Sequence, residues 1–191
     1  MWTTLGTTAG SDSTYAVAAA HVHAMYGPAL SGFMATLQSV SVWCGDTHTE
    51  QVRLAVFLGG MSSGTSPTGA TLLEDLGQTT GSVTNGWVQR NSPLKPGFPG
   101  SAVLWIGVKA DNTTGTFAMT YSATTDSWGD FSTDGQWTLS TEVAASDTAW
   151  STAINSVTGP TTYWYNARLT YTVSTAPGVN VGTRIVQRFS T

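Results

Sequence analysis

The sequence predicts an all-β protein built from antiparallel strands, and three observations carry that prediction. Charged residues make up only 9% of the 191 residues, and Thr, Ser, Gly and Trp are abundant in their place. Thr and Trp favour strands, while Gly favours the turns between them. Short apolar runs are separated by turn signals along the whole chain, whereas few segments have the composition of a helix. Together these features are typical of a sandwich or barrel of about 8–10 strands.

The chain is most simply one domain, because 191 residues are enough to bury a full core. Residues 1–14 are small and polar, which indicates an extended N-terminal arm or a first edge strand. Residues 15–191 are then predicted to form a single sandwich domain. Alanines within residues 13–27 favour a helix, but alternate residues from Tyr15 to His23 fit a period of two, so a strand is favoured.

The strands expected farther along the chain show the same period. In residues 33–45 apolar and polar side chains alternate with one slip at 38–39, which predicts a half-buried strand with a bulge. Residues 50–60 place Val52, Leu54, Val56 and Leu58 on one face. Residues 102–108 are continuously apolar and predict a central strand covered on both faces. Further strands are expected twice within 70–91 and at 116–123, 136–143, 161–175 and 184–190.

Charge and cysteine content exclude several classes of function. The net charge is −4 and the seven basic residues are scattered, so neither nucleic acid nor an anionic membrane is expected as a partner. A single cysteine excludes an internal disulfide framework. Residues 1–27 lack the pattern of a secretory signal, and no apolar run is long enough to span a bilayer. This combination fits proteins that are made in a host cytoplasm and released by lysis, such as virion components, and it also fits a chain whose export signal has been removed.

Four stretches together resemble a known kind of module. They are "LQSVSVWCGDTHTEQVRLAVFLGG", "GATLLEDLG", "NGWVQ" and "PGSAVLWIGVKAD", between Leu37 and Asp111. In this order they are similar to jelly-roll β-sandwich modules of tailed-phage virion surface proteins and of domains appended to secreted carbohydrate-active proteins. The resemblance implies a jelly-roll sandwich and a place on a particle surface, and it supplies no catalytic residue. The long "GGMSSGTSPTG" turn departs from the pattern and suggests a loop adapted to a particular neighbour.

The stretch "WCGDTHTE" raises the question of a metal site. Asp46, His48 and Glu50 would share one face of a strand, and His21 and His23 have the same spacing, so zinc ligands could come from two strands. The alternative is a solvated hairpin turn over residues 45–49, where Asp and Thr are common for backbone reasons. The turn is favoured, and no metal or other cofactor is expected here.

Catalytic chemistry has little support in the sequence. Cys44 alternates with Val42 and Val40, so it is predicted to be buried and inert and not a nucleophile activated by His48. No nucleophile elbow or zinc-protease motif is present. A carboxylate pair for glycoside hydrolysis would have to come from Glu50, Glu74, Asp75 or Glu142, and nothing in the sequence aligns any two of them.

Residues 124–137, "TTDSWGDFSTDGQW", form the best candidate for ligand binding. Carboxylates every fourth residue could hold calcium, although the spacing is not that of an EF-hand, and exposed aromatic rings beside carboxylates suit a sugar. The alternative is an ordinary turn whose aromatics cap the sandwich. The candidate residues for glycan or partner contact are Trp128, Phe131, Trp137, Asp126, Asp130 and Asp134.

Three further residues are candidates for contacts between subunits. Trp164 and Arg168 alternate with an apolar face in residues 161–175 and are of types enriched at protein–protein hot spots. Trp2 lies in the arm, which together with the tail after Pro177 is expected to reach neighbouring subunits.

These inferences predict a non-enzymatic phage virion structural protein, a capsid decoration or auxiliary protein on the particle surface. Its partners would be the major capsid protein or other virion subunits, and it would form a homo-oligomer, for which a trimer is one option. The alternative is a carbohydrate-binding module or a receptor-binding tail-fibre domain whose partner is a cell-surface glycan.

Overall fold

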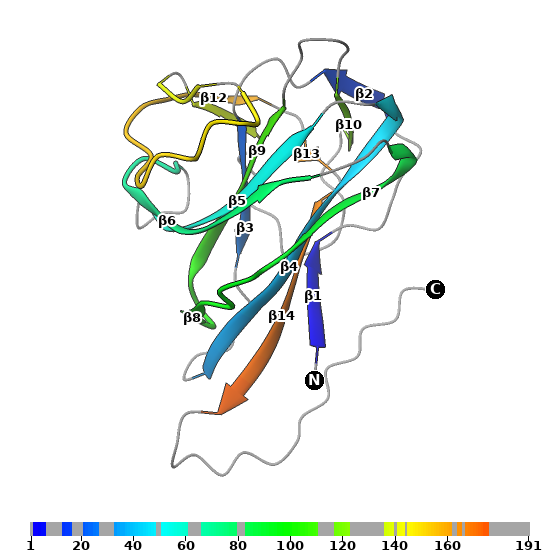
Figure 1. Ribbon diagram of the computed structural model, residues 1–191. Coiled ribbons are helices and arrows are strands. Elements are labelled where there is room, and N and C mark those ends of the chain that lie inside the picture. The colour runs from blue at the N-terminus through cyan, green and yellow to red at the C-terminus, as the bar shows by residue number, and fades with distance from the viewer. Residues whose placement is uncertain are drawn as a thin grey trace.

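A computed structural model gives the structure of the chain and confirms the predicted all-β class. It describes residues 2–6, 13–16, 21–26, 33–48, 51–60, 66–79, 83–110, 117–122, 136–139, 141–143, 145–161, 164–165 and 167–175. Within these ranges there are fourteen strands, no helix, and antiparallel pairing in both sheets (Figure 1). The jelly-roll connectivity stays a prediction.

The first sheet, called sheet A, is organised around the long strand β4 (Phe33–His48). β4 pairs with four of the strands: β14, β7, β8 and β10. The remaining strands of sheet A pair with β14 or β10. Besides β4, the strands of sheet A are β1 (Trp2–Gly6), β2 (Ser13–Ala16), β7 (Val83–Asn91), β8 (Gly97–Pro99), β10 (Ala118–Ser122), β13 (Trp164–Tyr165) and β14 (Ala167–Thr175).

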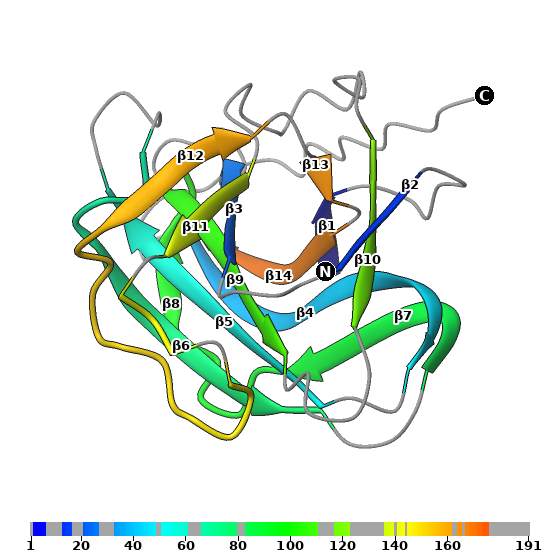
Figure 2. The same cartoon turned by 90° about the horizontal axis from the view of Figure 1, so that it is seen from above.

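The second sheet, sheet B, lies across the core from sheet A, as the view from above shows (Figure 2). Its strand order is β12-β11-β3-β9-β5-β6. The bounds are β3 (His21–Tyr26), β5 (Val52–Gly59), β6 (Ala70–Gln78), β9 (Val103–Ala110), β11 (Gln136–Leu139) and β12 (Val157–Thr161).

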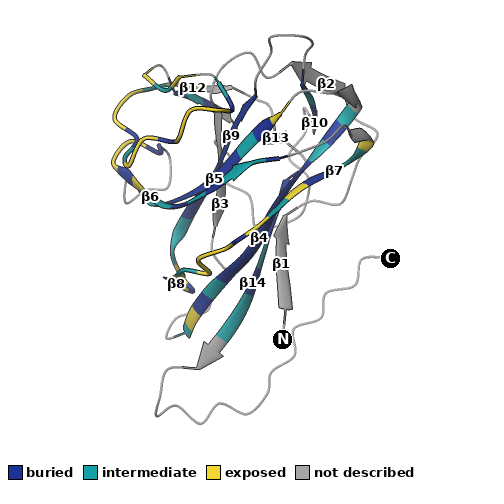
Figure 3. Ribbon diagram, in the orientation of Figure 1, coloured by how far each residue is buried: buried dark blue, intermediate teal, exposed yellow. Residues whose placement is uncertain are grey.

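The main core lies between the two sheets and is built by alternate residues of the central strands. The apolar face predicted for residues 50–60 is confirmed, because Val52, Leu54 and Val56 are fully buried in this core and Leu58 packs against it. Sheet A contributes the opposing rows: Leu37, Val40, Val42 and Cys44 from β4, and Ala167, Leu169 and Tyr171 from β14. Figure 3 shows the resulting buried stripe along β4.

Sheet B is buried on its outer face as well. β9 is buried from Leu104 to Ala110, which confirms the strand predicted to be covered on both faces. A second apolar cluster forms on this outer face: Ala55, Phe57, Ala70, Trp105, Trp137, Leu139, Trp150 and Ile154. The cover comes from residues 145–156, here called the strap, which run beside β6 (Figure 1).

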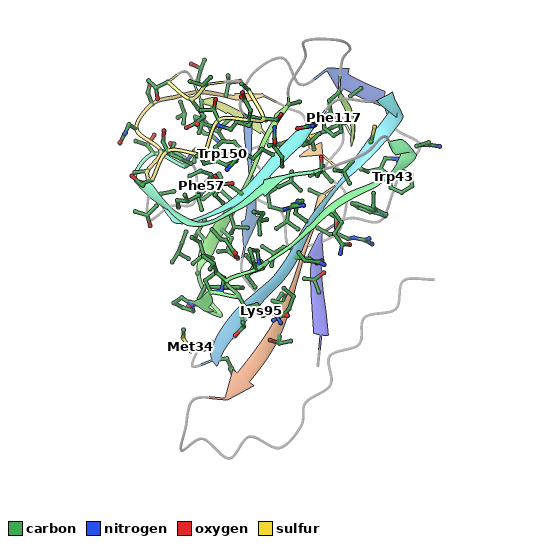
Figure 4. All side chains as sticks on the ribbon, viewed as in Figure 1. Met34, Trp43, Phe57, Lys95, Phe117 and Trp150 are labelled. Atoms are coloured by element: carbon green, nitrogen blue, oxygen red, sulfur yellow. The ribbon has the colours of Figure 1, made fainter. Side chains whose placement is uncertain are left out.

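The strap is fixed to β6 by backbone hydrogen bonds. Leu72 N donates to Thr152 O, Ile154 N donates to Ala70 O, and Thr71 and Ala153 form an isolated bridge. Trp150 packs edge-on against Phe57, with ring centroids 5.5 Å apart (Figure 4). Gly107 makes room for both rings, because a Cβ there would lie 3.0 Å from each of them.

Other expectations are partly confirmed and partly corrected. The register of β4 against β14 shifts at the predicted slip, between Thr170 and Tyr171, so the bulge is confirmed. The turn predicted over residues 45–49 is wrong, since β4 continues to His48 and pairs with β7 after a second irregularity. Pairing with a distant strand overrides the local turn propensity there. Residues 184–190 lie outside the described residues.

The N-terminal residues follow the edge-strand alternative. β1 pairs along its whole length with β14, and β2 pairs with β10. Part of the predicted arm is therefore an edge of sheet A.

Candidate binding surface

Sheet A carries two tryptophans and an arginine on the face that points away from the core. Val42 and Val88 belong to the core, so their neighbours Trp43 and Trp87 point outward from β4 and β7. The two tryptophans are directly opposite in the register, and their rings meet edge to face with centroids 5.3 Å apart. Arg168 lies outward on β14 between the buried Ala167 and Leu169. These three half-buried residues are called the Trp–Arg platform.

Arg168 reaches across β4 to stack on Trp87. Its guanidinium carbon is 3.9 Å from the centroid of a Trp87 ring, although β14 and β7 are separated by β4 and hence by about 10 Å. The residue that both strands share as a neighbour is Ser41, which pairs with Arg168 on one side and Gln89 on the other. Ser41 faces outward but is only 1% exposed. We infer that a side chain as small as serine is needed beneath the stacked arginine.

Arg168 has no ionic partner within the described part of the chain. The two ion pairs found there are Arg53–Asp75 and Lys109–Glu142. Partial burial lowers the pKa of Arg168 from its usual value, and a guanidinium nonetheless stays protonated at neutral pH. The platform therefore presents a partly desolvated positive charge whose N–H donors have no acceptor among the residues that the structure describes.

Amide and hydroxyl groups continue the surface beside the platform. Ser41 Oγ donates to Gln89 Oε1 at 3.3 Å, and Gln89 Nε2 donates to Asn91 Oδ1 at 2.9 Å. Gln38 Nε2 donates to Thr172 Oγ1 at 3.2 Å. Gln89 and Asn91 are exposed, and exposed stretches are coloured along the β7 ribbon in Figure 3. These neutral groups can donate to and accept from a ligand rich in hydroxyls.

The buried and half-buried acidic side chains, in contrast, have structural roles. Glu74 is 2% exposed and accepts hydrogen bonds from Ser92 Oγ and Leu94 N, which fixes the turn after β7. Asp75 points to the other face of sheet B, where it accepts two bonds from Arg53 and one from Trp150 N. The two carboxylates are adjacent in sequence but do not face one cleft.

Glu142 is the third of these carboxylates and anchors the strap. Its Oε1 lies 2.9 Å from Lys109 Nζ, and its Oε2 accepts from Ser151 N. Lys109 is fully buried, donates also to Ala149 O, and lies 4.7 Å from the centroid of a Trp150 ring.

The loop predicted to bind a glycan or calcium is only partly described. Trp128, Phe131, Asp126, Asp130 and Asp134 lie outside the described residues. Trp137 is 9% exposed and belongs to the apolar cluster under the strap. Its predicted place in an exposed aromatic patch is therefore wrong, because β11 turns this residue toward the covered face of sheet B.

The three histidines lie on strands of different sheets. His21 and His23 are in β3 of sheet B, whereas His48 ends β4 in sheet A. Their side chains lie outside the described residues, as do the side chain of Asp46 and all of Glu50. Among the described side chains, no three of the His, Cys, Asp and Glu type form a group that could hold a metal. Cys44 is fully buried, as predicted.

Of the three residues predicted to contact other subunits, only Arg168 has a described side chain. Arg168 is half-buried on the outer face, where a partner could reach it. Trp2 pairs with Thr172 and Trp164 pairs with Ser122 through the backbone, while their side chains lie outside the described residues.

Sequence reasoning missed Trp43 and Trp87 as members of the site. The signal was present, because each precedes a core residue in a strand of period two and so had to point outward. What the sequence did not contain was the pairing of β4 with β7, which brings the two indoles together.

Comparisons with known proteins leave the resemblance untested. Searches against protein families, curated proteins and solved structures each found no match to the chain. None of the described segments is a helix long and apolar enough to cross a membrane.

Proposed function

We propose that the chain is a non-enzymatic structural protein of a phage particle surface, a capsid decoration or auxiliary protein that binds its partner through the outer face of sheet A. The Trp–Arg platform carries the binding part of the proposal. Trp and Arg are among the side chains most enriched at interface hot spots, and here they stack on one another and are held in place before any partner arrives. The place on a particle is supported by the very low charge content and by the resemblance to virion modules.

The non-enzymatic part is supported by the hydrogen bonds that the buried and half-buried carboxylates make. Glu74, Asp75 and Glu142 each hold a turn or the strap through hydrogen bonds, so each already has a structural function. The described charges that remain exposed lie apart from the platform, as Lys95 does at the opposite end of sheet A (Figure 4).

The test is quantitative mass spectrometry of purified particles from the source of this chain, followed by rebinding of purified variants to particles that lack the protein. Hundreds of copies per particle are expected for a decoration protein. Arg168→Ala and Trp87→Ala should each lower occupancy, while the control Lys95→Ala should not. Absence of the chain from particles would exclude the proposal, and equal occupancy by all variants would exclude the platform as the contact.

A second candidate function is binding of a cell-surface glycan, as in a receptor-binding tail-fibre domain. The observation that favours it is the row of exposed amides next to two indoles, since aromatic rings and hydrogen-bonding amides suit sugar rings and hydroxyls. A handful of copies per particle would favour this candidate over decoration.

A further inference from the structure

The charge on the Trp–Arg platform has a specific consequence if the second candidate function, glycan binding, holds. Arg168 is the one charged side chain in the platform, and the described residues give it no carboxylate partner. Of the other buried or half-buried cations that the structure describes, Arg53 and Lys109 are paired with carboxylates, and Arg90 donates its Nε–H to Leu76 O. Arg168 differs from all three, because among the described residues its guanidinium stacks on Trp87 but has neither a carboxylate nor a carbonyl partner.

We propose that the outer face of sheet A binds an acidic polysaccharide, with a sugar carboxylate paired to the Arg168 guanidinium and a sugar ring against the indoles. The planar guanidinium presents parallel N–H donors that match the two oxygens of a carboxylate. Its stacking on Trp87 restricts its orientation, so less conformational freedom is lost when the pair forms.

The uncharged outward side chains of β7 indicate what the part of the ligand beyond the carboxylate is. Trp87, Gln89 and Asn91 occupy alternate positions of one strand and so extend over about 14 Å. The Nδ2 group of Asn91 makes no hydrogen bond to the described residues, and Gln89 Nε2 uses one of its two hydrogens. Exposed donors in a line beside an indole suit the hydroxyls of an extended sugar chain better than they suit a single small anion.

An acidic protein segment would also supply a carboxylate to Arg168, and it is the main competing explanation. Such a segment gains affinity chiefly by burying apolar anchors. Around the platform the described outward side chains of β4, β7 and β14 are Ser, Gln, Asn and Thr, and the exposed apolar residue of β4, Met34, lies at the other end of that strand. The composition of the surface therefore favours a polysaccharide as the source of the carboxylate.

The experiment is isothermal titration calorimetry of the whole chain with oligomers of four acidic polysaccharides: polygalacturonate, alginate, hyaluronan and polysialic acid. Each is paired with a carboxyl-esterified form, which keeps the rings and removes the charge. Binding of at least one acid is expected, with a loss of about ten- to a hundredfold on esterification. The same loss is expected for Arg168→Gln, and added salt should weaken the interaction. Thermal melting of each variant checks that it is folded, and Lys95→Gln is the control for removing one positive charge elsewhere.

The other outcomes distinguish the proposal of an acidic ligand from the broader proposal of glycan binding. Equal affinity for the acid and its ester, or full affinity in Arg168→Gln, overturns the acidic ligand and keeps glycan binding. No affinity for any of the eight ligands overturns the acidic polysaccharide. If Arg168→Gln then also fails to occupy particles, the carboxylate belongs to a protein partner.

Discussion

The outer faces of the two sheets differ in whether their charged side chains have an ion-pair partner. On sheet B the strap covers the face, and each described charge beneath it has a partner: Lys109 with Glu142, and Arg53 with Asp75. On sheet A no described segment packs over the Trp–Arg platform, and Arg168 is stacked but not ion-paired. The described charges under the strap therefore stabilise the fold as pairs, whereas Arg168 keeps a charge that no described carboxylate neutralises. This is the basis on which we propose Arg168 for recognition.

The largest effect is expected when the Trp150 ring, which the strap packs against sheet B, is removed. Trp150→Ala should lower the free energy of unfolding by about 3–5 kcal/mol, because a large buried side chain is lost over Phe57 and Gly107. Denaturant titration measures the change. Val143→Ala, at an exposed position before the strap, is the control and should stay within about 0.5 kcal/mol of the original chain. A loss below 1 kcal/mol for Trp150→Ala would mean that the strap does not stabilise sheet B.

The next test breaks the buried ion pair. Lys109→Met should cost about 3–5 kcal/mol, because it leaves the Glu142 carboxylate buried without its counterion. The double variant Lys109→Met/Glu142→Leu removes both charges and should recover most of that loss. Chemical denaturation of the original chain, of the single variants Lys109→Met and Glu142→Leu and of the double variant gives the coupling energy. If the double variant is no more stable than Lys109→Met, the pair does not act as a unit.

A smaller effect on stability is expected from the half-buried ion pair Arg53–Asp75 on the outer face of sheet B, and this effect depends on pH. Burial by itself would raise the pKa of Asp75, but hydrogen bonds from Arg53, Trp150 N and Gly77 N and the charge of Arg53 outweigh it and lower the pKa below the ordinary value. A carboxyl group whose pKa is lowered on folding stabilises the fold above its unfolded pKa, near 4. That stabilisation is lost as the pH falls through the lowered value. Asp75→Asn should therefore be less stable than the original chain at pH 7, and the difference should shrink steadily below pH 4. An equal difference at pH 7 and pH 2.5 would contradict this assignment.

The smallest change in stability is expected on sheet A. Arg168→Gln removes a half-exposed cation–π contact and should lower the free energy of unfolding by only about 0.5–1 kcal/mol. Thermal and denaturant unfolding measure it, with Ser41→Leu as a comparison. The leucine would displace Arg168 from its position over β4, so both variants should lose the same ligand or particle binding. A loss of 3 kcal/mol or more in Arg168→Gln would instead place this residue with the structural charges of sheet B.

Much of the fold could be predicted from local sequence pattern. The period of two identified β4, β5 and β14, the slip at 38–39 marked the bulge, and the unbroken apolar run of β9 correctly indicated two covered faces. These features are encoded in short windows because burial alternates along each strand.

The strap and the binding surface depend on contacts between distant segments and could not be predicted in that way. Residues 145–156 have no strand period, and they meet β6 about 80 positions earlier in the chain. Likewise, Trp43, Trp87 and Arg168 come from three strands whose neighbour relations are set only by the completed sheet. Sequence reasoning therefore proposed Arg168 as a contact residue but coupled it with Trp164, and it placed the other candidate aromatics in the loop that ends at Trp137, a residue that is itself buried.

The single cysteine can be used to measure how often the main core opens. Cys44 lies on the inner row of the strand that joins most of sheet A, and its side chain is fully buried. A thiol reagent can reach the sulfur only when the two sheets separate around it, so the labelling rate follows the opening of the main core and not the surface. Because Arg168 lies on the opposite side of the same sheet, a ligand on the platform would slow that reaction only by stabilising the whole sandwich. The sulfur can therefore report binding without touching the ligand.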